Sequence, residues 1–511
     1  MTLFTLSPIM LSPPSFWDVA VAVSAMALVS YVYGVAQTLR SPLRKLPGAR
    51  EHALNIFLGD RLVAMLKSQF LKRHLVQLDL HQRYGPIVLL NNSTISVSDT
   101  QLHSYIAFDL DLPKAEIYKL LNIYPEVYSI FSAIDKSYHR MLRRTLSPAF
   151  GARSLRMQEP LIEDCLTNFL QSVARSCTGP KLEATVDIWA TIRLFTLDVT
   201  GLTAFGTEFN MIRNGQHRLP STINSIFLFR SVKAVFPFIE YLPFLPIVQK
   251  RNEDVQYLED FVFALIRERK SGAVNRSDLL QFIVDAVDPD TGKGLTDKEI
   301  FSSVTALLTA GSETTASALA FGLIRIAEDR KVLEKLQSEL DAVQLDPSSR
   351  LISHSSAKKL PYLNAVIDEI IRIDPTAGAG GMRQADSDIS LGSYAIPKGT
   401  NINMTIYSAH YDEHYWQNPT QLNPERFLSG NPDVKKHHVP FSLGPRNCIG
   451  KEFALIEMRL FLANFVRLFD MRLPDGPPQS KAQVLSVTLG LESQTYKLVV
   501  TPRTESVLQS L

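Results

Sequence analysis

One loop near the C-terminal end carries more chemical information than any other part of the chain: Phe441-Ser442-Leu443-Gly444-Pro445-Arg446-Asn447-Cys448-Ile449-Gly450. Its single cysteine has no second cysteine or histidine close by, so it does not match the ligand sets of zinc or iron–sulfur sites. A lone thiolate can instead be the single axial ligand of a haem. Gly444 and Gly450 allow a sharp turn and a close approach of the backbone to a flat ring. The loop therefore predicts a haem-thiolate site.

The other residues of this loop suit a thiolate ligand. Backbone N–H groups of the turn, and the start of a helix expected from about Ile449, favour a deprotonated sulfur. Phe441 can pack beside the sulfur and exclude water, and Arg446 can pair with a haem propionate. A thiolate ligand pushes electron density toward iron and favours cleavage of an O–O bond. An ordinary buried cysteine is the alternative interpretation of Cys448.

The loop resembles the haem-binding loop of the cytochrome P450 family, whose pattern F-x-x-G-x-R-x-C-x-G it matches at every defined position. The resemblance implies a mainly α fold with small β-sheets, and haem b with Cys448 as its axial thiolate ligand. It also implies insertion of one atom of O₂ into a lipophilic small molecule. Electrons would come from NADPH through a membrane-bound NADPH-cytochrome P450 reductase, with cytochrome b5 as a further candidate donor.

Composition and charge exclude several other classes of protein. The 511 residues are 45% hydrophobic, enough for a large core, and neither a flexible linker nor a repeat is visible. A formal net charge of +2, without a basic run interleaved with aromatics, argues against nucleic-acid binding. Three cysteines exclude a disulfide scaffold and suit a reducing compartment. We interpret Cys165 and Cys177 as packing residues of a helical region.

The N-terminal end predicts a membrane anchor. Residues 19–39 carry no charge and are long enough to span a bilayer as a helix. Basic residues follow at once, whereas residues 1–17 carry no charged side chain, so the positive-inside rule places the body in the cytoplasm. A cleaved signal peptide is the alternative, because Ala25-Met26-Ala27 resembles a cleavage site, but a basic n-region is missing and the apolar run continues.

The expected organisation follows from that anchor. It comprises a short lumenal tail (1–18), a single transmembrane helix (19–39), a basic, proline-containing hinge (40–50) and a catalytic haem domain (51–511). The predicted location is the endoplasmic reticulum membrane, with the catalytic domain on the cytoplasmic side.

Periodicity and capping signals predict the main elements of the body. Thr296 and Glu299 form a capping box that should start a long helix reaching about Asp329. Helices are also expected at 360–373 and 449–469, and most of 147–374 has helical periodicity. Short strands are expected at 86–90 and 94–97, and in the alternating tail 485–501.

The long helix contains Ala310-Gly311-Ser312-Glu313-Thr314-Thr315. A mid-helix glycine costs about 1 kcal/mol relative to alanine, which suggests that something needs room against the backbone. Thr314 can donate to the Ala310 carbonyl and bend the helix, leaving a groove for dioxygen. Glu313 and Thr314 can relay protons. Taken alone, these residues also describe a surface glutamate beside a packing contact; the resemblance to the family motif A-G-x-E/D-T favours the catalytic interpretation.

Two further groups of charged residues match the family. Glu369 and Arg372 form an E-x-x-R with both side chains on one helix face. By resemblance, they and Arg426 make a buried network that holds the cysteine loop. His139 and Arg143 stand where the family has W-x-x-x-R, with histidine in place of tryptophan, and Arg383 stands at a third cation position. The resemblance makes His139, Arg143, Arg383 and Arg446 candidate propionate ligands.

Three parts of the sequence suggest where partners, the membrane and the substrate would bind. Lys435, Lys436, Lys451 and Arg459 flank the loop and could form a basic docking face for an acidic redox partner. Residues 226–244 are rich in aromatics and, by resemblance, cover the pocket and touch the membrane. The small residues of 376–381 would leave space above the haem. The chain is similar to fungal enzymes of secondary metabolism, so we expect a terpenoid or polyketide intermediate as the substrate.

Three other functions are compatible with a haem-thiolate site. One is an isomerase or dehydratase that needs no O₂, although such relatives tend to lack the acid–alcohol pair represented here by Glu313 and Thr314. A second is a non-catalytic haem sensor or carrier. A third is a secreted peroxygenase, which would need a cleaved signal peptide. Consumption of NADPH with a reductase separates the monooxygenase from all three.

Overall fold

The computed structural model describes residues 70–504 except 216, 236, 275, 277 and 346–349, together with residues 28, 29, 32, 36 and 40–48. The predicted tail 1–18 lies outside the described residues, and so does most of the predicted anchor 19–39. The described positions within the anchor are helical, and the side chains of Leu28, Val29 and Val32 are exposed. The anchor stays a prediction.

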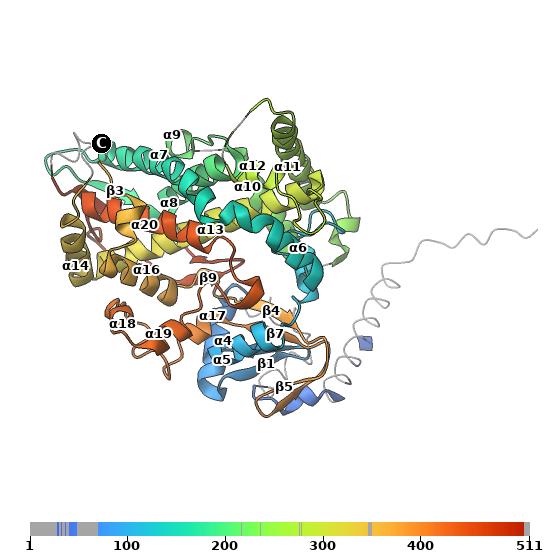
Figure 1. The fold of residues 1–511 in the computed structure, drawn as a ribbon. Helices are drawn as coiled ribbons and strands as arrows, with labels where there is room; N and C mark the ends of the chain where they lie inside the picture. The colour runs from blue at the N-terminus through green and yellow to red at the C-terminus, as the bar shows by residue number, and fades with distance from the viewer. Residues whose placement is uncertain are drawn as a thin grey trace, which may run out of the picture.

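Helices form most of the molecule, in agreement with the expected mainly α class (Figure 1). The helices are α4 (Arg73–Tyr84), α5 (Thr100–Ser104), α6 (Lys136–Leu146), α7 (Ala152–Ser176), α8 (Ile188–Thr200), α9 (Met211–Asn214), α10 (Arg218–Val235), α11 (Pro246–Lys270), α12 (Leu279–Val284), α13 (Asp297–Glu328), α14 (Arg330–Asp341), α15 (His354–Ala357), α16 (Pro361–Ile373), α17 (Ile406–His410), α18 (Glu425–Leu428), α19 (Pro432–His437) and α20 (Lys451–Leu468). A π-helical turn η4 (Tyr105–Asp109) and a 3₁₀ turn η9 (Gly444–Arg446) also bear on the site.

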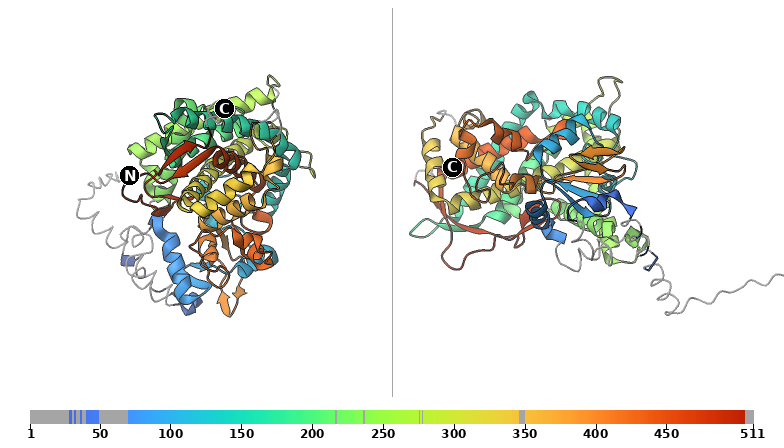
Figure 2. Two further views of the ribbon diagram at one scale, coloured as in Figure 1. Left: turned by 90° about the vertical axis from the view of Figure 1, so that its left-hand side faces the viewer. Right: turned by 90° about the horizontal axis from the view of Figure 1, so that it is seen from below.

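Small sheets lie beside and between the helices (Figures 1 and 2). The largest has the order β1-β2-β7-β4, and its central pair β2 and β7 is parallel, with Ile95 opposite Ile402. A second sheet has the order β3-β11-β8, and β9–β10 and β5–β6 are antiparallel pairs. The strands are β1 (Ile87–Asn91), β2 (Thr94–Val97), β3 (Ala184–Asp187), β4 (Gly381–Gln384), β5 (Ile389–Leu391), β6 (Tyr394–Ile396), β7 (Asn401–Met404), β8 (Phe469–Arg472), β9 (Gln483–Leu485), β10 (Leu489–Leu491) and β11 (Lys497–Pro502).

The main core lies where α7, α8, α13, α16 and α20 pack together. Aromatic rings join three of these helices: the Phe169 ring lies 5.1 Å from Phe461, and Phe195 lies 5.1 Å from Phe461. Residues 188–205 and helix α13 are long and apolar enough to cross a membrane, but most of their residues are buried in the body. They are therefore core helices and have no bearing on the predicted anchor.

Local sequence signals place the ends of the helices that carry the site. The capping box is confirmed, since the Glu299 carboxylate accepts from the Thr296 N–H at 2.9 Å and the Glu299 N–H donates to the Thr296 hydroxyl at 3.3 Å. Helix α20 starts at Lys451, two residues after the expected start at Ile449. The reason is local: η9 occupies the preceding turn, and Asn447 is extended.

The described part of the hinge, residues 40–48, packs on the first sheet. Leu43 and Leu46 are buried in a cluster that includes residues of β1 and β2, and the Leu89 N–H donates to the Pro47 carbonyl at 2.9 Å. This segment therefore enters the body along β1.

Candidate active site

The cysteine loop is a tight turn between η9 and α20. The Cys448 N–H donates to the Phe441 carbonyl at 2.9 Å, and the Asn447 N–H donates to the Gly444 carbonyl at 3.1 Å. Gly444 has φ +75°, and a Cβ there would lie 2.8 Å from the Ala107 carbonyl oxygen. Glycine is therefore required at this position because the loop packs on η4, a reason different from the approach to a ring that the sequence suggested.

Gly450 has a different environment from Gly444. A Cβ at Gly450 would meet no described protein atom within 4 Å. Phe441, also assigned to this site from the sequence, is half-buried against the main core, and the Lys451 ammonium lies 5.8 Å from its ring centre. Protein packing therefore does not explain a glycine at position 450, whereas a flat group lying against the backbone would.

The Cys448 side chain is exposed, although surrounding atoms desolvate its sulfur. Burial raises the pKa of this thiol, and a hydrogen bond from the Gly450 N–H and the charges of Arg143 and Lys451 act in the opposite direction. The expected stabilisation of the thiolate by backbone N–H groups is thus present but weaker than desolvation. A coordinated metal ion deprotonates such a thiol outright.

Arg143 and Arg446 fasten the loop to the rest of the protein. Arg143, on α6, donates to the Asn447 carbonyl at 2.7 Å and to its side-chain oxygen at 2.8 Å. Arg446 donates to the carbonyls of Ala133 and, at 2.7 Å, Ile134, just before α6. Both predicted propionate ligands therefore already bind protein oxygens, which positions them at the loop.

A second group, which we call the cation cluster, consists of Lys114, His139 and Arg383, with Arg446 at its edge. The first three side chains are buried. The Nε and Nη1 atoms of Arg383 have no hydrogen-bond partner among the described residues. The Lys114 ammonium lies 4.3 Å from the ring centre of Phe131 and donates to that residue's carbonyl.

The charges of this cluster repel one another. Burial, then Arg383 and Arg446, hold the pKa of Lys114 well below its usual value. Burial, followed by the charges of Arg446, Lys114, Arg143 and Arg383, lowers the pKa of His139 to about 3. Asp111 and Asp135 offset part of the positive charge from nearby. A ligand that brings two carboxylates, as haem does, would satisfy the free donors and relieve this repulsion.

Lys114 was missed by sequence reasoning. Its backbone pairs with Arg383 as an isolated antiparallel bridge, so two residues far apart in the chain become neighbours through the fold alone. A cavity of about 300 Å³ opens beside the cluster and the cysteine loop. It is lined by Asp111, Lys136, His139, Arg140, Arg143, Arg144, Pro445 and Arg446.

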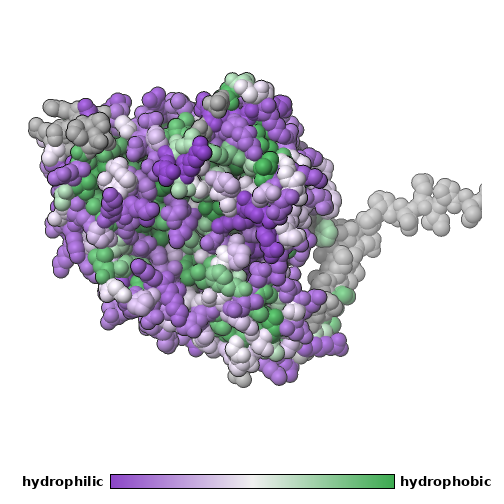
Figure 3. All heavy atoms as spheres, viewed as in Figure 1, coloured by the Kyte–Doolittle hydropathy of each residue, from purple (hydrophilic) through white to green (hydrophobic). Residues whose placement is uncertain are grey.

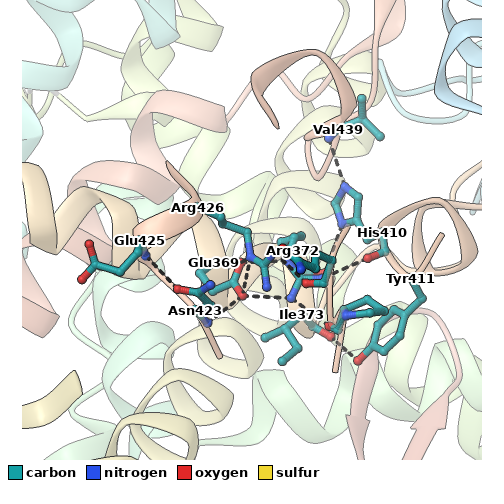
Figure 4. Close-up of polar contacts among 11 residues, drawn as sticks. Glu369, Arg372, Ile373, His410, Tyr411, Asn423, Glu425, Arg426 and Val439 are labelled. Carbon is teal, nitrogen blue, oxygen red and sulfur yellow. Dashed lines mark hydrogen bonds and ion pairs between the residues drawn. The ribbon is translucent and has the colours of Figure 1, made fainter. Parts of the chain in front are cut away.

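Glu369, Arg372 and Arg426 form the expected contacts, which we call the buried network (Figure 4). Arg372 donates to both Glu369 carboxylate oxygens at 2.7 and 2.9 Å, and the Arg426 Nε donates to the same carboxylate at 3.1 Å. The side chains of Glu369 and Arg372 are 0% exposed. Two further Arg372 N–H groups donate to the carbonyls of His410 and Pro419, each at 2.9 Å.

His410, which sequence reasoning missed, connects this network to the cysteine loop (Figure 4). Its Nε2 accepts from the Val439 N–H at 3.0 Å, so its Nδ1 is the atom that donates to the Arg372 carbonyl at 3.1 Å. Burial holds the pKa of His410 well below its usual value, which agrees with this neutral tautomer. The Ser442 N–H then bonds to the Val439 carbonyl at 3.0 Å and continues the chain into the loop.

The acid–alcohol pair lies in the middle of α13. Thr314 donates to the Ala310 carbonyl at 2.6 Å, as expected. Ala310 is exposed, although most of its neighbours in this helix are buried or half-buried. The carboxylate of Glu313 accepts from the Arg193 Nη2 at 2.7 Å, and these two side chains are 32% and 30% exposed. The sequence did not indicate that α8 would supply an arginine to hold Glu313.

The small residues after α16 form a turn with a fixed backbone. The Gly380 N–H donates to the Ala377 carbonyl at 2.8 Å, and the Leu489 N–H of β10 donates to the Thr376 carbonyl at 2.9 Å. Gly380 has φ +73°, and a Cβ there would lie only 1.6 Å from the Met404 carbonyl oxygen. The turn is therefore held between β7 and the β9–β10 hairpin.

The aromatic stretch 226–244 divides into a buried and an exposed part. Ile226 and Phe229 are buried in α10, whereas Phe238, Tyr241 and Phe244 are 78%, 73% and 69% exposed. In the face drawn in Figure 3, hydrophilic residues dominate and hydrophobic residues occur in separate patches. The residues that follow α10 are thus the ones that present aromatic side chains to the surroundings.

The suggested docking face is smaller than the sequence indicated. Lys435, Lys436 and Lys451 are exposed. Arg459 is half-buried, and its Nε donates to the Asn364 side-chain oxygen at 2.8 Å, so its assignment to a docking surface is wrong. The Arg459 side chain points from α20 toward Asn364 on α16, which explains why it is not part of the exposed basic surface.

Comparison with known proteins agrees with this geometry. The family model described as Cytochrome P450 matches residues 61–500. Cytochrome P450 monooxygenase FUS8 of Gibberella fujikuroi is 32% identical over 490 residues, which cover 94% of this chain and 93% of the relative. Cytochrome P450 monooxygenase LUC2 of a Fusarium species is 30% identical over 478 residues (92% and 91%), and acrD of Aspergillus aculeatus is 30% identical over 490 residues (93% and 95%). The chain therefore belongs to the cytochrome P450 family, whose haem monooxygenases bind haem b through a cysteine thiolate.

Proposed function

We propose that this cytochrome P450 monooxygenase oxidises a terpenoid or polyketide intermediate of secondary metabolism, with Cys448 as the axial ligand of its haem. The observation that carries the ligand assignment is the exposed thiol of Cys448 in a loop that borders the cation cluster, where Arg383 keeps two buried donors without partners among the described residues. Similarity to fungal monooxygenases supports the substrate class. NADPH-cytochrome P450 reductase is the proposed electron donor, with cytochrome b5 as a second candidate.

Each part of the site has a distinct task in this proposal. The Cys448 sulfur would bind the iron, Arg383, Lys114 and His139 would bind the propionates, and Gly450 would leave room for the ring. Arg143 and Arg446 would hold the loop through their bonds to Asn447 and Ile134. When bound, haem supplies the iron at which O₂ is reduced and from which one oxygen atom reaches the substrate.

Glu313 and Thr314 would handle protons. The Glu313 carboxylate is partly exposed and paired with Arg193, so it can exchange a proton with solvent when that ion pair opens. The Thr314 Oγ1, oriented by the Ala310 carbonyl, would pass the proton inward. Replacing Thr314 by Ala should leave haem bound, lower the product formed per NADPH and raise peroxide release. Unchanged coupling would remove Thr314 from this role.

The exposed aromatics Phe238, Tyr241 and Phe244 would contact the endoplasmic reticulum membrane, from which a lipophilic substrate enters. Together with the predicted anchor 19–39, they support a membrane-bound enzyme with a cytoplasmic catalytic domain. Deleting residues 1–40 should then weaken membrane association and leave some of it in place. Full release of the truncated protein from vesicles would contradict a second contact.

The spectrum of the ferrous carbon monoxide complex tests the ligand. Wild-type protein should absorb at about 450 nm, as the family's thiolate-bound haem does. Cys448→Ala should lose this band, while the control variant Cys177→Ala, at a buried cysteine outside the loop, should keep it. A Cys448→Ala protein that retains the band would overturn the assignment.

Two further experiments test the reaction and the substrate. NADPH consumption with purified reductase separates a monooxygenase from an isomerase. Comparing the metabolites of a deletion strain with those of its parent identifies the substrate.

A further inference from the structure

Gln483, the first residue of β9, has a side chain that joins the end of α16 to α17. Its amide nitrogen donates to the Asp374 carboxylate at 2.6 Å, and its amide oxygen accepts from the Tyr407 hydroxyl at 3.2 Å. A carboxylate can only accept and a phenol can donate, so one orientation of the amide satisfies both partners. The Gln483 side chain is therefore fixed at both of its polar atoms, and the proposed mechanism makes no use of it.

The carboxylate that holds Gln483 is itself anchored to the core. Asp374 directly follows α16, and its side chain is 0% exposed. Arg325 of α13 donates to both oxygens of this carboxylate, each at 2.9 Å. A two-pronged pair of this kind fixes the orientation of the carboxylate as well as its position. We call Arg325, Asp374, Gln483 and Tyr407 the turn clamp.

The turn clamp reaches the turn 376–381 through Tyr407. The Tyr407 N–H donates to the Gly378 carbonyl at 3.0 Å, and a Cβ at Gly378 would lie 3.3 Å from the Tyr407 Cβ. The Tyr407 ring stacks on Tyr411, with ring centres 4.6 Å apart, and Tyr411 donates to the Ile373 carbonyl at 2.8 Å (Figure 4). The clamp therefore sets the position of the middle of this turn.

A second turn, 486–488, follows the strand that carries the clamp glutamine. Leu489, the first residue of β10, donates to the Thr376 carbonyl at 2.9 Å, so the two turns are bonded to each other. Ala377 in one turn is exposed, and Val487 in the other is 47% exposed. The two turns thus offer apolar side chains to a ligand, whereas the polar side chains that hold them are buried or half-buried.

We propose that Gln483 is a positioning residue that determines specificity: it holds the turns 376–381 and 486–488 at one spacing, and this spacing limits the size of the lipophilic substrate that the enzyme accepts. It acts through Asp374 and Tyr407, so its own side chain does not have to touch the substrate. The inference rests on the proposed function, because it takes the two turns as walls of the substrate space. A bulky ligand that contacts both turns binds better when they are already fixed, because ordering loose segments on binding costs free energy.

Two nitrogen ligands of haem iron test this effect in the holoenzyme. Imidazole is small enough to reach the iron without touching the turns, whereas clotrimazole is an imidazole that carries a bulky aromatic group. Gln483→Leu and Tyr407→Phe should each bind clotrimazole about 3- to 10-fold more weakly and bind imidazole as tightly as the wild type. The shift of the haem absorption band during titration measures both dissociation constants. The double variant should bind clotrimazole no more weakly than Gln483→Leu, because that substitution already removes the bond to Tyr407.

Amide hydrogen exchange, followed by mass spectrometry, tests the turns directly. The N–H groups of Tyr407 and Leu489 bond to turn carbonyls, so their exchange rates report how often the turns move away. Both should exchange several-fold faster in Gln483→Leu than in the wild-type holoenzyme. Gln479→Leu is the matched control, because the Gln479 side chain bonds to the backbone of Lys497 and lies outside the turn clamp. It should change neither the exchange rates nor the binding of clotrimazole.

The outcomes separate the inference from the proposed function. Unchanged clotrimazole affinity, or an equal loss for imidazole and clotrimazole, would overturn the specificity role, and so would unchanged exchange at both amides. If Gln483→Leu does not fold, Tyr407→Phe decides, because it removes one hydroxyl and keeps the stacked ring. Failure of the wild type to oxidise NADPH with a reductase would refute the monooxygenase proposal alone, because an azole binds to haem without NADPH or a reductase.

Discussion

The buried network and the cation cluster both place charged side chains near the cysteine loop, but the protein satisfies them to different degrees. In the network, Arg372 makes four hydrogen bonds to Glu369, His410 and Pro419. In the cluster, Arg383 keeps two buried donors without partners among the described residues, and burial with the charges of Arg383 and Arg446 lowers the pKa of the neighbouring Lys114 and His139. The comparison teaches that a buried arginine paired with a carboxylate indicates architecture, even where one donor such as Arg426 Nη2 has no partner, whereas a buried arginine without a paired carboxylate among the described residues indicates where a ligand binds.

The largest effect should come from breaking the network. Replacing Glu369 by Ala leaves Arg372 and Arg426 buried without their carboxylate, which should lower the free energy of unfolding by about 3–5 kcal/mol. Thermal unfolding followed by circular dichroism, together with the yield of haem-loaded protein, measures it. Glu425→Gln is the matched control, because this nearby glutamate is exposed and, among the described residues, forms an ion pair only with Lys335. A Glu369→Ala protein as stable as the control would show that the network is dispensable.

The next effect should come from the cation cluster and fall on haem binding. Arg383→Leu removes donors that the proposed propionates would use, so haem should leave about 10- to 100-fold faster, the range expected for lost hydrogen bonds to charged groups. Transfer of haem to apomyoglobin measures the rate. Arg140→Leu, an exposed arginine beside the same cavity, should have little effect. Equal rates in wild type and Arg383→Leu would remove Arg383 from the ligand site.

The third prediction concerns the pH dependence of stability. His139 has its pKa lowered from 6.5 to about 3, so below pH 6.5 the unfolded chain binds a proton that the folded chain does not. Stability of haem-depleted protein should therefore fall as pH decreases from about 6.5 to 3, by up to about 1.4 kcal/mol per pH unit from this residue. Denaturant midpoints of wild type and His139→Phe measure the difference. Bound haem should make the slope shallower, because propionates would raise the pKa of His139. An identical slope with and without haem would contradict propionate contact.

The smallest effect should come from the exposed cations. Lys435→Ala and Lys436→Ala should leave both stability and haem retention unchanged, because water already solvates these side chains. They should weaken apparent binding of the reductase by a few-fold at low ionic strength, and salt should abolish the difference. A salt-independent loss would place these lysines in a different role from docking.

Local sequence patterns predicted the elements and the loop well, because their causes are local. The capping box of Thr296 and Glu299, the spacing of Glu369 and Arg372, and the bond from Thr314 to Ala310 each involve residues a few positions apart. Such contacts follow from helical geometry, so the sequence specifies them without knowledge of the fold.

Contacts between distant segments could not be predicted. Arg193 reaches Glu313 from α8, Lys114 lies beside Arg383 through a single β-bridge, and His410 connects α16 to the loop. None of these belongs to a motif, and each depends on how elements pack. The assignment of Arg459 to the docking face was wrong for the same reason, because its position in the sequence does not indicate which face of α20 is buried.

The turn after α16 has a practical consequence for changing what the enzyme accepts. A side chain at Gly380 would overlap the Met404 carbonyl oxygen, so every substitution there would displace β7. Variants at this position would therefore not show how the turn affects the choice of substrate. Thr376, Ala377 and Ala379 have no such backbone constraint in the described structure. Random mutagenesis aimed at new products should therefore hold Gly380 constant and diversify its neighbours.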